Sequence, residues 1–384
     1  MFPNSRILIC ILSTLLACKD EDRLEIVRMD NYLSETWTID NMYLEEELNA
    51  HKNSAFFNGM YIYFNSDSSN VQGFKRKINE LKKNGLLGAY IKLAESHLFG
   101  ILGDTTNAEV LLSEALRIDS TNHWLLLELS HLKSSNSERI YILTRAISIK
   151  PNFYRAKLFK ALLLDVTTDA KQIIELIESS DNLPMDIDIY NYLAEAYFFS
   201  GDIDRSESLY LKSIEIKKNV NAFVGLGSTY HYQKQDLNLA ETYLQSAYKI
   251  DSTNISVIRS IGWLFYDLYG KERSDYYFSK LIDRLSELDE TDISDLLDYY
   301  ILNKDAIRSK LIVRTMIENF GENYRTIGYD LIVNYIKPNN EGNDLYLNLY
   351  KKNFGQSSFE WLDDKLNQLE FDISSKIIVE KPNI

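Results

Sequence analysis

An internal repeat constrains the fold of this chain more than any other feature of its sequence. The segment Ala108-Glu-Val-Leu-Leu-Ser-Glu-Ala-Leu-Arg-Ile-Asp-Ser-Thr-Asn122 shares nine of its fifteen residues with Ala240-Glu-Thr-Tyr-Leu-Gln-Ser-Ala-Tyr-Lys-Ile-Asp-Ser-Thr-Asn254. When all copies are aligned on one small or apolar landmark, it falls at Ala115, Ala146, Ile177, Ser213, Ala247 and Leu281, in steps of 31, 31, 36, 34 and 34 residues. A period of this length predicts stacked units that each bury an apolar face on the next.

The spacing of apolar residues predicts that these units are helical. Apolar residues recur three and four positions apart almost throughout, as they do on amphipathic helices. Proline, which interrupts helices, occurs only five times in 384 residues. The segment 37–64 is left open, because its runs Trp37–Leu44 and Met60–Phe64 are also compatible with strands.

Three units share a short pattern in their first helix, in which a small residue is followed three positions later by an aromatic one. The pattern reads Leu193-Ala194-x-x-Tyr197, Leu226-Gly227-x-x-Tyr230 and Ile261-Gly262-x-x-Phe265. A small residue lets two helices approach closely, and the aromatic ring fills the gap beside a neighbouring helix.

This unit of about 34 residues resembles the tetratricopeptide repeat, a helix-turn-helix motif. The resemblance implies an all-α solenoid, a right-handed superhelix of paired helices. We expect such repeats over residues 87–290, degenerate helical repeats and a cap over 291–384, and a possible degenerate repeat within 31–86.

The amino terminus has the features of an export signal. Arg6 precedes an apolar run, Ile7 to Leu16, which is too short to cross a bilayer as a helix. Leu15-Leu16-Ala17-Cys18 resembles the lipobox of bacterial lipoproteins, which implies that residues 1–17 are removed and that Cys18 is acylated. The alternative is an ordinary signal peptide that happens to contain a cysteine.

Residues 18–30 are then expected to form an acidic tether. The run Lys19-Asp-Glu-Asp22 resembles the surface-export signal of Bacteroidota lipoproteins, so the expected location is the outer membrane. Whether the chain faces the surface or the periplasm is left open.

The charge of the chain argues against a nucleic-acid partner. It has 42 basic and 56 acidic residues, a formal net charge of −14. Nucleic-acid binding needs a basic face that neutralises phosphates.

The sequence contains no recognisable catalytic, cofactor or metal motif. The five histidines are His51, His97, His123, His131 and His231, and no two of them have the spacing of zinc ligands on a helix. His97 takes the place of the aromatic packing residue in its repeat, so a core position is the better interpretation. Carboxylates are abundant, but most are expected to form solvated faces. We therefore expect no enzyme activity, no cofactor and no metal.

Stacked helical repeats offer a groove lined by the first helix of each pair, so the groove residues follow from helical spacing. The predicted candidates are Asn191, Glu195, Phe198, His231, Arg259, Trp263 and Tyr266. Aromatic residues and arginine are common anchors at interfaces. The alternative is that these aromatic side chains only pack on neighbouring elements.

These features predict a lipid-anchored scaffold that binds a protein or peptide partner in the bacterial cell envelope. The alternative is a surface lipoprotein that binds a glycan or another nutrient beside an outer-membrane transporter. The starch-utilisation lipoproteins, which suggest this alternative, are typically longer and carry large inserted loops.

Overall fold

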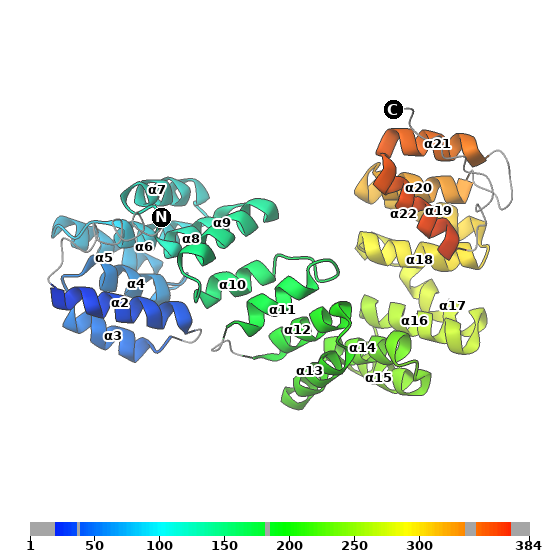
Figure 1. Ribbon diagram of the computed structural model, residues 1–384, viewed down its shortest axis with the longest axis horizontal. Coiled ribbons are helices and arrows are strands. Elements are labelled where there is room, and N and C mark those ends of the chain that lie inside the picture. Colours follow the sequence, from blue (N-terminus) through cyan, green and yellow to red (C-terminus); the bar gives the residue numbers. More distant parts are fainter. Residues whose placement is uncertain (1–19, 37–38, 181–184, 335–342, 370–384) are drawn as a thin grey trace, which may run out of the picture. The chain divides into compact units, whose positions relative to one another are not determined.

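The computed structural model describes residues 20–36, 39–180, 185–334 and 343–369, and every regular element in these ranges is a helix. The fold is an all-helical repeat fold of the tetratricopeptide type, as the sequence predicted. The chain divides into two compact units, Met1–Leu209 and Tyr210–Ile384, and each is described by itself (Figure 1).

The first unit consists of helices packed mainly on their chain neighbours, and its boundary falls within α13. Its helices are α2 (Asp20–Glu35), α3 (Asn41–Ala50), α4 (Ala55–Asn65), α5 (Val71–Lys83), α6 (Ala89–Ile101), α7 (Thr105–Ile118), α8 (His123–Leu132), α9 (Asn136–Ile149), α10 (Tyr154–Ala161), α11 (Ala170–Glu178), α12 (Ile187–Ser200) and α13 (Ile203–Ile216).

The second unit contains one short π-helical turn, η1, which directly continues α14. Its elements are α14 (Val220–Ser228), η1 (Thr229–Gln233), α15 (Leu237–Ile250), α16 (Ile255–Tyr269), α17 (Lys271–Ile282), the 3₁₀ turn η2 (Leu285–Glu287), α18 (Glu290–Leu302), α19 (Ala306–Phe320), α20 (Tyr324–Asn334), α21 (Asn343–Phe354) and α22 (Gln356–Gln368). Helices α18 to α22 occupy the described part of the segment where degenerate helical repeats were expected.

The repeated Asp-Ser-Thr-Asn segment is conserved between the two copies because it builds a turn and starts the next helix. In the second copy, Asp251 Oδ1 accepts hydrogen bonds from the backbone N–H and the hydroxyl of Thr253, at 2.9 and 2.7 Å. Asn254 then caps α16 by accepting from the N–H of Val257 at 3.1 Å. Asp119 and Asn122 make the same kinds of contact ahead of α8. Side-chain caps of this kind satisfy donors that a helix start leaves free.

The two helices of a repeat pack closely at the predicted small residues. A Cβ atom added to Gly227 of α14 would lie 2.5 Å from the Leu244 side chain of α15. A Cβ atom added to Gly262 of α16 would lie 2.9 Å from the ring of Phe278 on α17. Only glycine permits these approaches, so both positions fix how their helix pairs cross.

The segment considered for strands contains two helices and no strand among its described residues. Residues 41–50 and 55–65 form α3 and α4, while residues 37 and 38 lie outside the described ranges. Phe56, Phe57, Met60 and Ile62 of α4 are all buried, so apolar residues occupy most of its circumference. Such a helix lacks the polar stripe that distinguishes a helical period from a run of strand residues.

The amino-terminal helix occupies most of the expected tether. Cys18 and Lys19 lie outside the described residues, and α2 begins at Asp20. Met29 and Leu33 of α2 are buried in the first unit, so the tether does not continue as free chain to residue 30. In the part of the chain that the structure describes, no helix is long and apolar enough to cross a membrane.

Candidate binding surface

The turn η1 and helices α16 and α18 of the second unit together form a mixed region of aromatic rings and carboxylates, in which Asp292 is buried and the other members are at least partly exposed. We call this surface the aromatic-acidic face. It consists of Tyr232, Arg259, Trp263, Tyr266, Asp267, Asp292, Asp295 and Asp298.

The aromatic part of the face is anchored on a stacked pair of rings. Phe278 and Tyr299 stack with their centroids 3.9 Å apart. Trp263 meets Phe278 edge-on at 5.3 Å, and Tyr266 meets Tyr299 edge-on at 5.7 Å. Trp263 and Tyr266 are consequently only half-exposed, and much of each ring contributes to packing.

The acidic part of the face follows from spacing on α18. Asp292, Asp295 and Asp298 are three residues apart, which places them along one side of the helix. Arg259 of α16 lies 2.5 Å from Asp292 and 3.5 Å from Asp295, so it forms ion pairs with two carboxylates.

Each carboxylate oxygen of Asp298 has a hydrogen-bond donor from another helix. It accepts hydrogen bonds from the hydroxyl of Tyr329 and from Nζ of Lys365, both at 2.7 Å. Burial nevertheless raises the pKa of Asp298, against the opposing effect of Lys365.

Asp295 combines solvent access with an unfavourable electrostatic environment. Burial raises the pKa of its carboxyl to about 6, and Arg259 opposes this shift without cancelling it. The side chain is nonetheless 39% exposed. Water therefore reaches the Asp295 carboxylate, although the surrounding protein disfavours its ionised form.

Tyr232 is also accessible to solvent while its pKa is shifted by its surroundings. It is 53% exposed, yet burial and the charges of Asp295 and Asp267 raise its pKa to about 12. Since the charge of Asp295 acts on the Tyr232 phenol, the two side chains lie near one another on the face.

The structure buries the predicted candidate His231 and exposes its neighbour instead. His231 is 6% exposed and its Nε2 lies 2.6 Å from Oδ2 of Asp267. The cause is η1, where the N–H of Lys234 bonds the carbonyl of Thr229 across five residues. A π-helical turn inserts one residue into the helical register, which moves the outward position from 231 to 232.

The remaining candidates of the second unit lie on the face, and those of the first unit lie on α12. Asn191 is buried, whereas Phe198 is half-exposed and meets the exposed Phe199 edge-on at 5.3 Å. Glu195 is exposed, but the surrounding protein raises its pKa by desolvation. Within the first unit, Glu195 therefore resembles Asp295 in its environment.

Two residues of the face, Tyr232 and Asp267, and the partner of a third, Lys365, had no signal in the spacing of the repeats. The spacing of the repeats points to position 231, whereas the π-helical turn makes Tyr232 the exposed residue. Asp267 is placed on the face by its contact with His231. Lys365 is 67 positions from its partner Asp298, a pairing that one sequence does not reveal. The three-residue spacing of the α18 aspartates was visible and could have been used.

Two histidines of the first unit contact the buried carboxylate of Glu128. His97 lies 3.0 Å from Oε1 of Glu128, and His131 lies 3.7 Å from its Oε2. His97 is partly buried between the helices, near the packing position expected for it. In the described ranges no three His, Cys, Asp or Glu side chains are grouped so that they could hold a metal ion.

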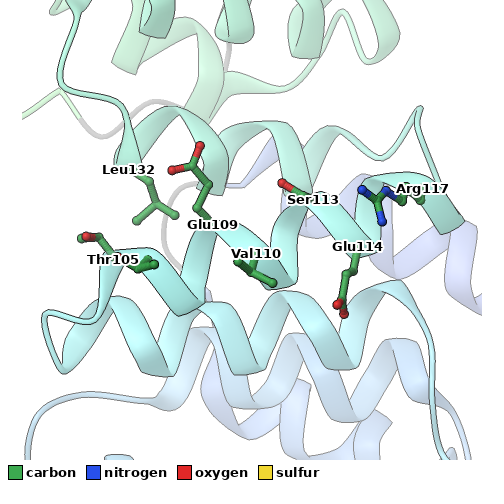
Figure 2. Close-up of a pocket in the computed structure, with 8 residues that line it drawn as sticks. Thr105, Glu109, Val110, Ser113, Glu114, Arg117 and Leu132 are labelled. Carbon is green, nitrogen blue, oxygen red and sulfur yellow. The ribbon is translucent and has the colours of Figure 1, made fainter.

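A shallow depression of about 460 Å³ lies over α7 in the first unit, and Figure 2 shows its lining. Its carboxylates are already engaged, because Lys92 contacts Glu114 at 2.6 Å and Lys133 pairs with Glu109. Because these carboxylates are already paired, they are poorly suited to bind a ligand in the depression.

Comparison with known proteins supports the repeat family. Residues 187–220, which cover α12 and α13, match the family described as tetratricopeptide repeat. No curated protein matches the chain.

Among solved structures, a tetratricopeptide repeat protein from Parabacteroides merdae is 16% identical with a TM-score of 0.53, covering 64% of this chain and 97% of its own. The carboxy-terminal part of a repeat protein from Cytophaga hutchinsonii is 14% identical with a TM-score of 0.39, covering 71% and 97%. Human IFIT1 is 16% identical with a TM-score of 0.43, covering 85% and 83%. The chain therefore contains a match to the tetratricopeptide repeat at residues 187–220, within an all-helical repeat fold of that type.

Proposed function

We propose that this protein is a scaffold that binds a protein partner through the aromatic-acidic face of its second unit. The observation that carries the proposal is the exposure of Tyr232 and Asp295, together with the long 3.5 Å contact that Asp295 makes with Arg259, which lies closer to Asp292. A fold gains nothing from a desolvated, underpaired carboxylate, whereas a binding partner could supply the missing contact. Tetratricopeptide repeats commonly hold peptide segments on the first helices of their pairs.

The glycan-binding alternative is less well supported by the geometry. A sugar ring stacks on an open aromatic face, but Trp263 and Tyr266 are both engaged with Tyr299. Partly buried aromatic anchors beside charged groups are more typical of protein interfaces.

We further propose that the protein is anchored in the outer membrane through an acylated Cys18. Leu15-Leu16-Ala17-Cys18 supports the anchor, and the acidic residues 20–22 support display at the cell surface. A periplasm-facing protein is the alternative, and external protease digestion of intact cells would distinguish the two.

Site-specific photo-crosslinking in intact cells tests the binding surface. A photoreactive amino acid at Tyr232 should yield a discrete adduct with another protein. Tyr276, a tyrosine on α17 that is 58% exposed, provides the matched control. Equal adducts at both positions, or none at Tyr232, would contradict the proposed surface.

A further inference from the structure

We propose that the face receives a lysine or arginine side chain of the partner, held between the Asp295 carboxylate and the Tyr232 ring. This inference rests on the proposed binding function and specifies the chemistry of the partner. It commits to a basic segment of a protein rather than to an acidic or a neutral one.

The first support is the balance of charges on the face. Within the part of the chain that the structure describes, Asp292, Asp295 and Asp298 form ion pairs with two cations, Arg259 and Lys365. Lys365 is bonded to Asp298, and Arg259 makes its shorter contact with Asp292. Asp295 is left with the longer contact of a shared arginine, so it lacks a cation of its own.

The second support is the aromatic surface beside that carboxylate. One face of the Tyr232 ring stacks on His231 at 4.2 Å, while about half of the residue remains exposed. A cation over the open part of an aromatic ring is attracted by the ring's negative face. A carboxylate next to such a ring is a setting that suits a lysine or arginine head group.

The third support is the backbone that presents Tyr232. The π-helical turn η1 is followed by Gln235, a non-glycine residue with φ of 55°. Left-handed backbone at such a residue costs free energy, and π-helical turns are frequent at functional sites. Without this turn, the regular helical register would expose position 231 in place of Tyr232.

An anionic segment would not fit the same place. Arg259 and Lys365 already bind the aspartates of α18, so neither offers a free positive charge. An incoming carboxylate or phosphate would meet the negative charges of Asp295 and Asp267 at close range. Like charges brought together in a desolvated site repel strongly.

Peptide binding to the intact purified protein tests the proposal. The probes are two labelled peptides of about ten residues that alternate serine with lysine or serine with glutamate. Asp295→Asn removes the proposed contact and keeps the side-chain shape, and Tyr232→Leu removes the aromatic face. Glu272→Gln on α17 is the matched control, because it removes one exposed carboxylate away from the proposed contact.

We expect the wild type to bind the lysine peptide and not the glutamate peptide, more weakly as salt increases. Asp295→Asn should weaken binding about tenfold, while Glu272→Gln should bind as the wild type does. Equal losses for both variants would mean that only the overall negative charge attracts the peptide, which overturns the proposal. Unchanged affinity of Asp295→Asn would overturn it as well.

The two proposals fail in different ways. If Tyr232 forms a protein adduct in cells but the lysine peptide does not bind, the surface is a binding site and its partner is not basic. If neither result is obtained, the proposed binding surface is itself wrong. Thermal unfolding of each variant shows that a loss of binding does not come from a loss of folding.

Discussion

Nε2 of His231 lies 2.6 Å from Oδ2 of Asp267, and this contact ties the π-helical turn η1 to the end of α16. His231 is buried by it, and the next residue, Tyr232, is left accessible. The proposed binding surface therefore depends on one extra residue in a helical turn as well as on the repeat.

The close helix crossing at Gly227 gives a test of the fold. Gly227→Ala would place a Cβ atom 2.5 Å from the Leu244 side chain, so the helices must shift apart. Overpacking of this kind costs about 1–3 kcal/mol. Chemical denaturation should show a loss in that range, and hydrogen exchange should increase around α14 and α15.

Gly73→Ala is the matched control for this substitution. Gly73 lies within α5, and no atom is within 4 Å of its added Cβ. Alanine should be neutral or stabilising there by up to about 1 kcal/mol, because glycine is the poorer helix former. Equal destabilisation by the two alanines would refute the assigned crossing.

The Glu128 network predicts how the first unit responds to acid. Burial disfavours its ionised form, but hydrogen bonds from His131 and His97 and their charges outweigh burial and lower the pKa to about 2. A carboxyl whose folded pKa is depressed stabilises the fold above its unfolded pKa, here about 4.5. This contribution should be lost as the pH falls from about 4.5 towards 2.

Glu128→Gln measures the contribution directly. Hydrogen bonds to a charged group contribute about 1.5–3 kcal/mol, so the variant should be less stable at pH 7 by an amount in that range. Its unfolding free energy should also vary less between pH 5 and pH 2 than that of the wild type. A variant with wild-type stability and an unaltered acid profile would exclude the network from this role.

Asp295 should behave in the opposite way. Its folded pKa of about 6 lies above the ordinary value of 3.8, so the folded state holds the proton more tightly than the unfolded chain does. Stability linked to this group is complete below pH 3.8 and declines as the pH rises through 6. Asp295→Asn should consequently melt at the same temperature as the wild type or higher at pH 7.5.

An unchanged or higher melting temperature would show that the role of Asp295 in binding is separate from any role in folding stability. A lower melting temperature for Asp295→Asn would instead show that its contact with Arg259 stabilises the fold. Asp298→Asn is a useful comparison, because Asp298 has direct contacts with Tyr329 and Lys365.

Acylation of Cys18 is the prediction that concerns location. Cells that express the wild type and are grown with a fatty-acid analogue should contain a labelled protein, and Cys18→Ala should remove the label. Cys10 lies within the expected signal and leaves Cys18 as the one thiol of the processed chain. Labelling that survives Cys18→Ala would show that the lipobox resemblance is misleading.

The repeat made the fold predictable because its recurring residues occupy positions that close helix packing requires. Ala115, Ala146, Ala247 and Leu281 are all completely buried, and Gly227 and Gly262 lie at close helix contacts. These positions recur for a packing reason, so a period in the sequence carries over directly into the structure. Segment 37–64 was ambiguous because α4, which covers its second half, is buried on nearly all sides.

The binding surface was less predictable because it depends on local departures from the repeat. Helical spacing led to Arg259, Trp263 and Tyr266, which lie on the face, and to His231, which is buried. No spacing rule foresees a π-helical turn, and no single sequence reveals that Lys365 pairs with Asp298. Tyr232 and Asp295 therefore emerged only from the three-dimensional arrangement.

Truncation of Tyr232 tests the central proposal, that the aromatic-acidic face binds a protein partner, most directly. The measurement is the affinity of the full-length Tyr232→Ala variant for the partner identified by crosslinking, with Tyr276→Ala as control. An aromatic hot-spot residue contributes about 2 kcal/mol or more, so Kd should rise about thirtyfold at an unchanged melting temperature. A Kd for Tyr232→Ala within a factor of two of both the wild type and Tyr276→Ala would contradict the account.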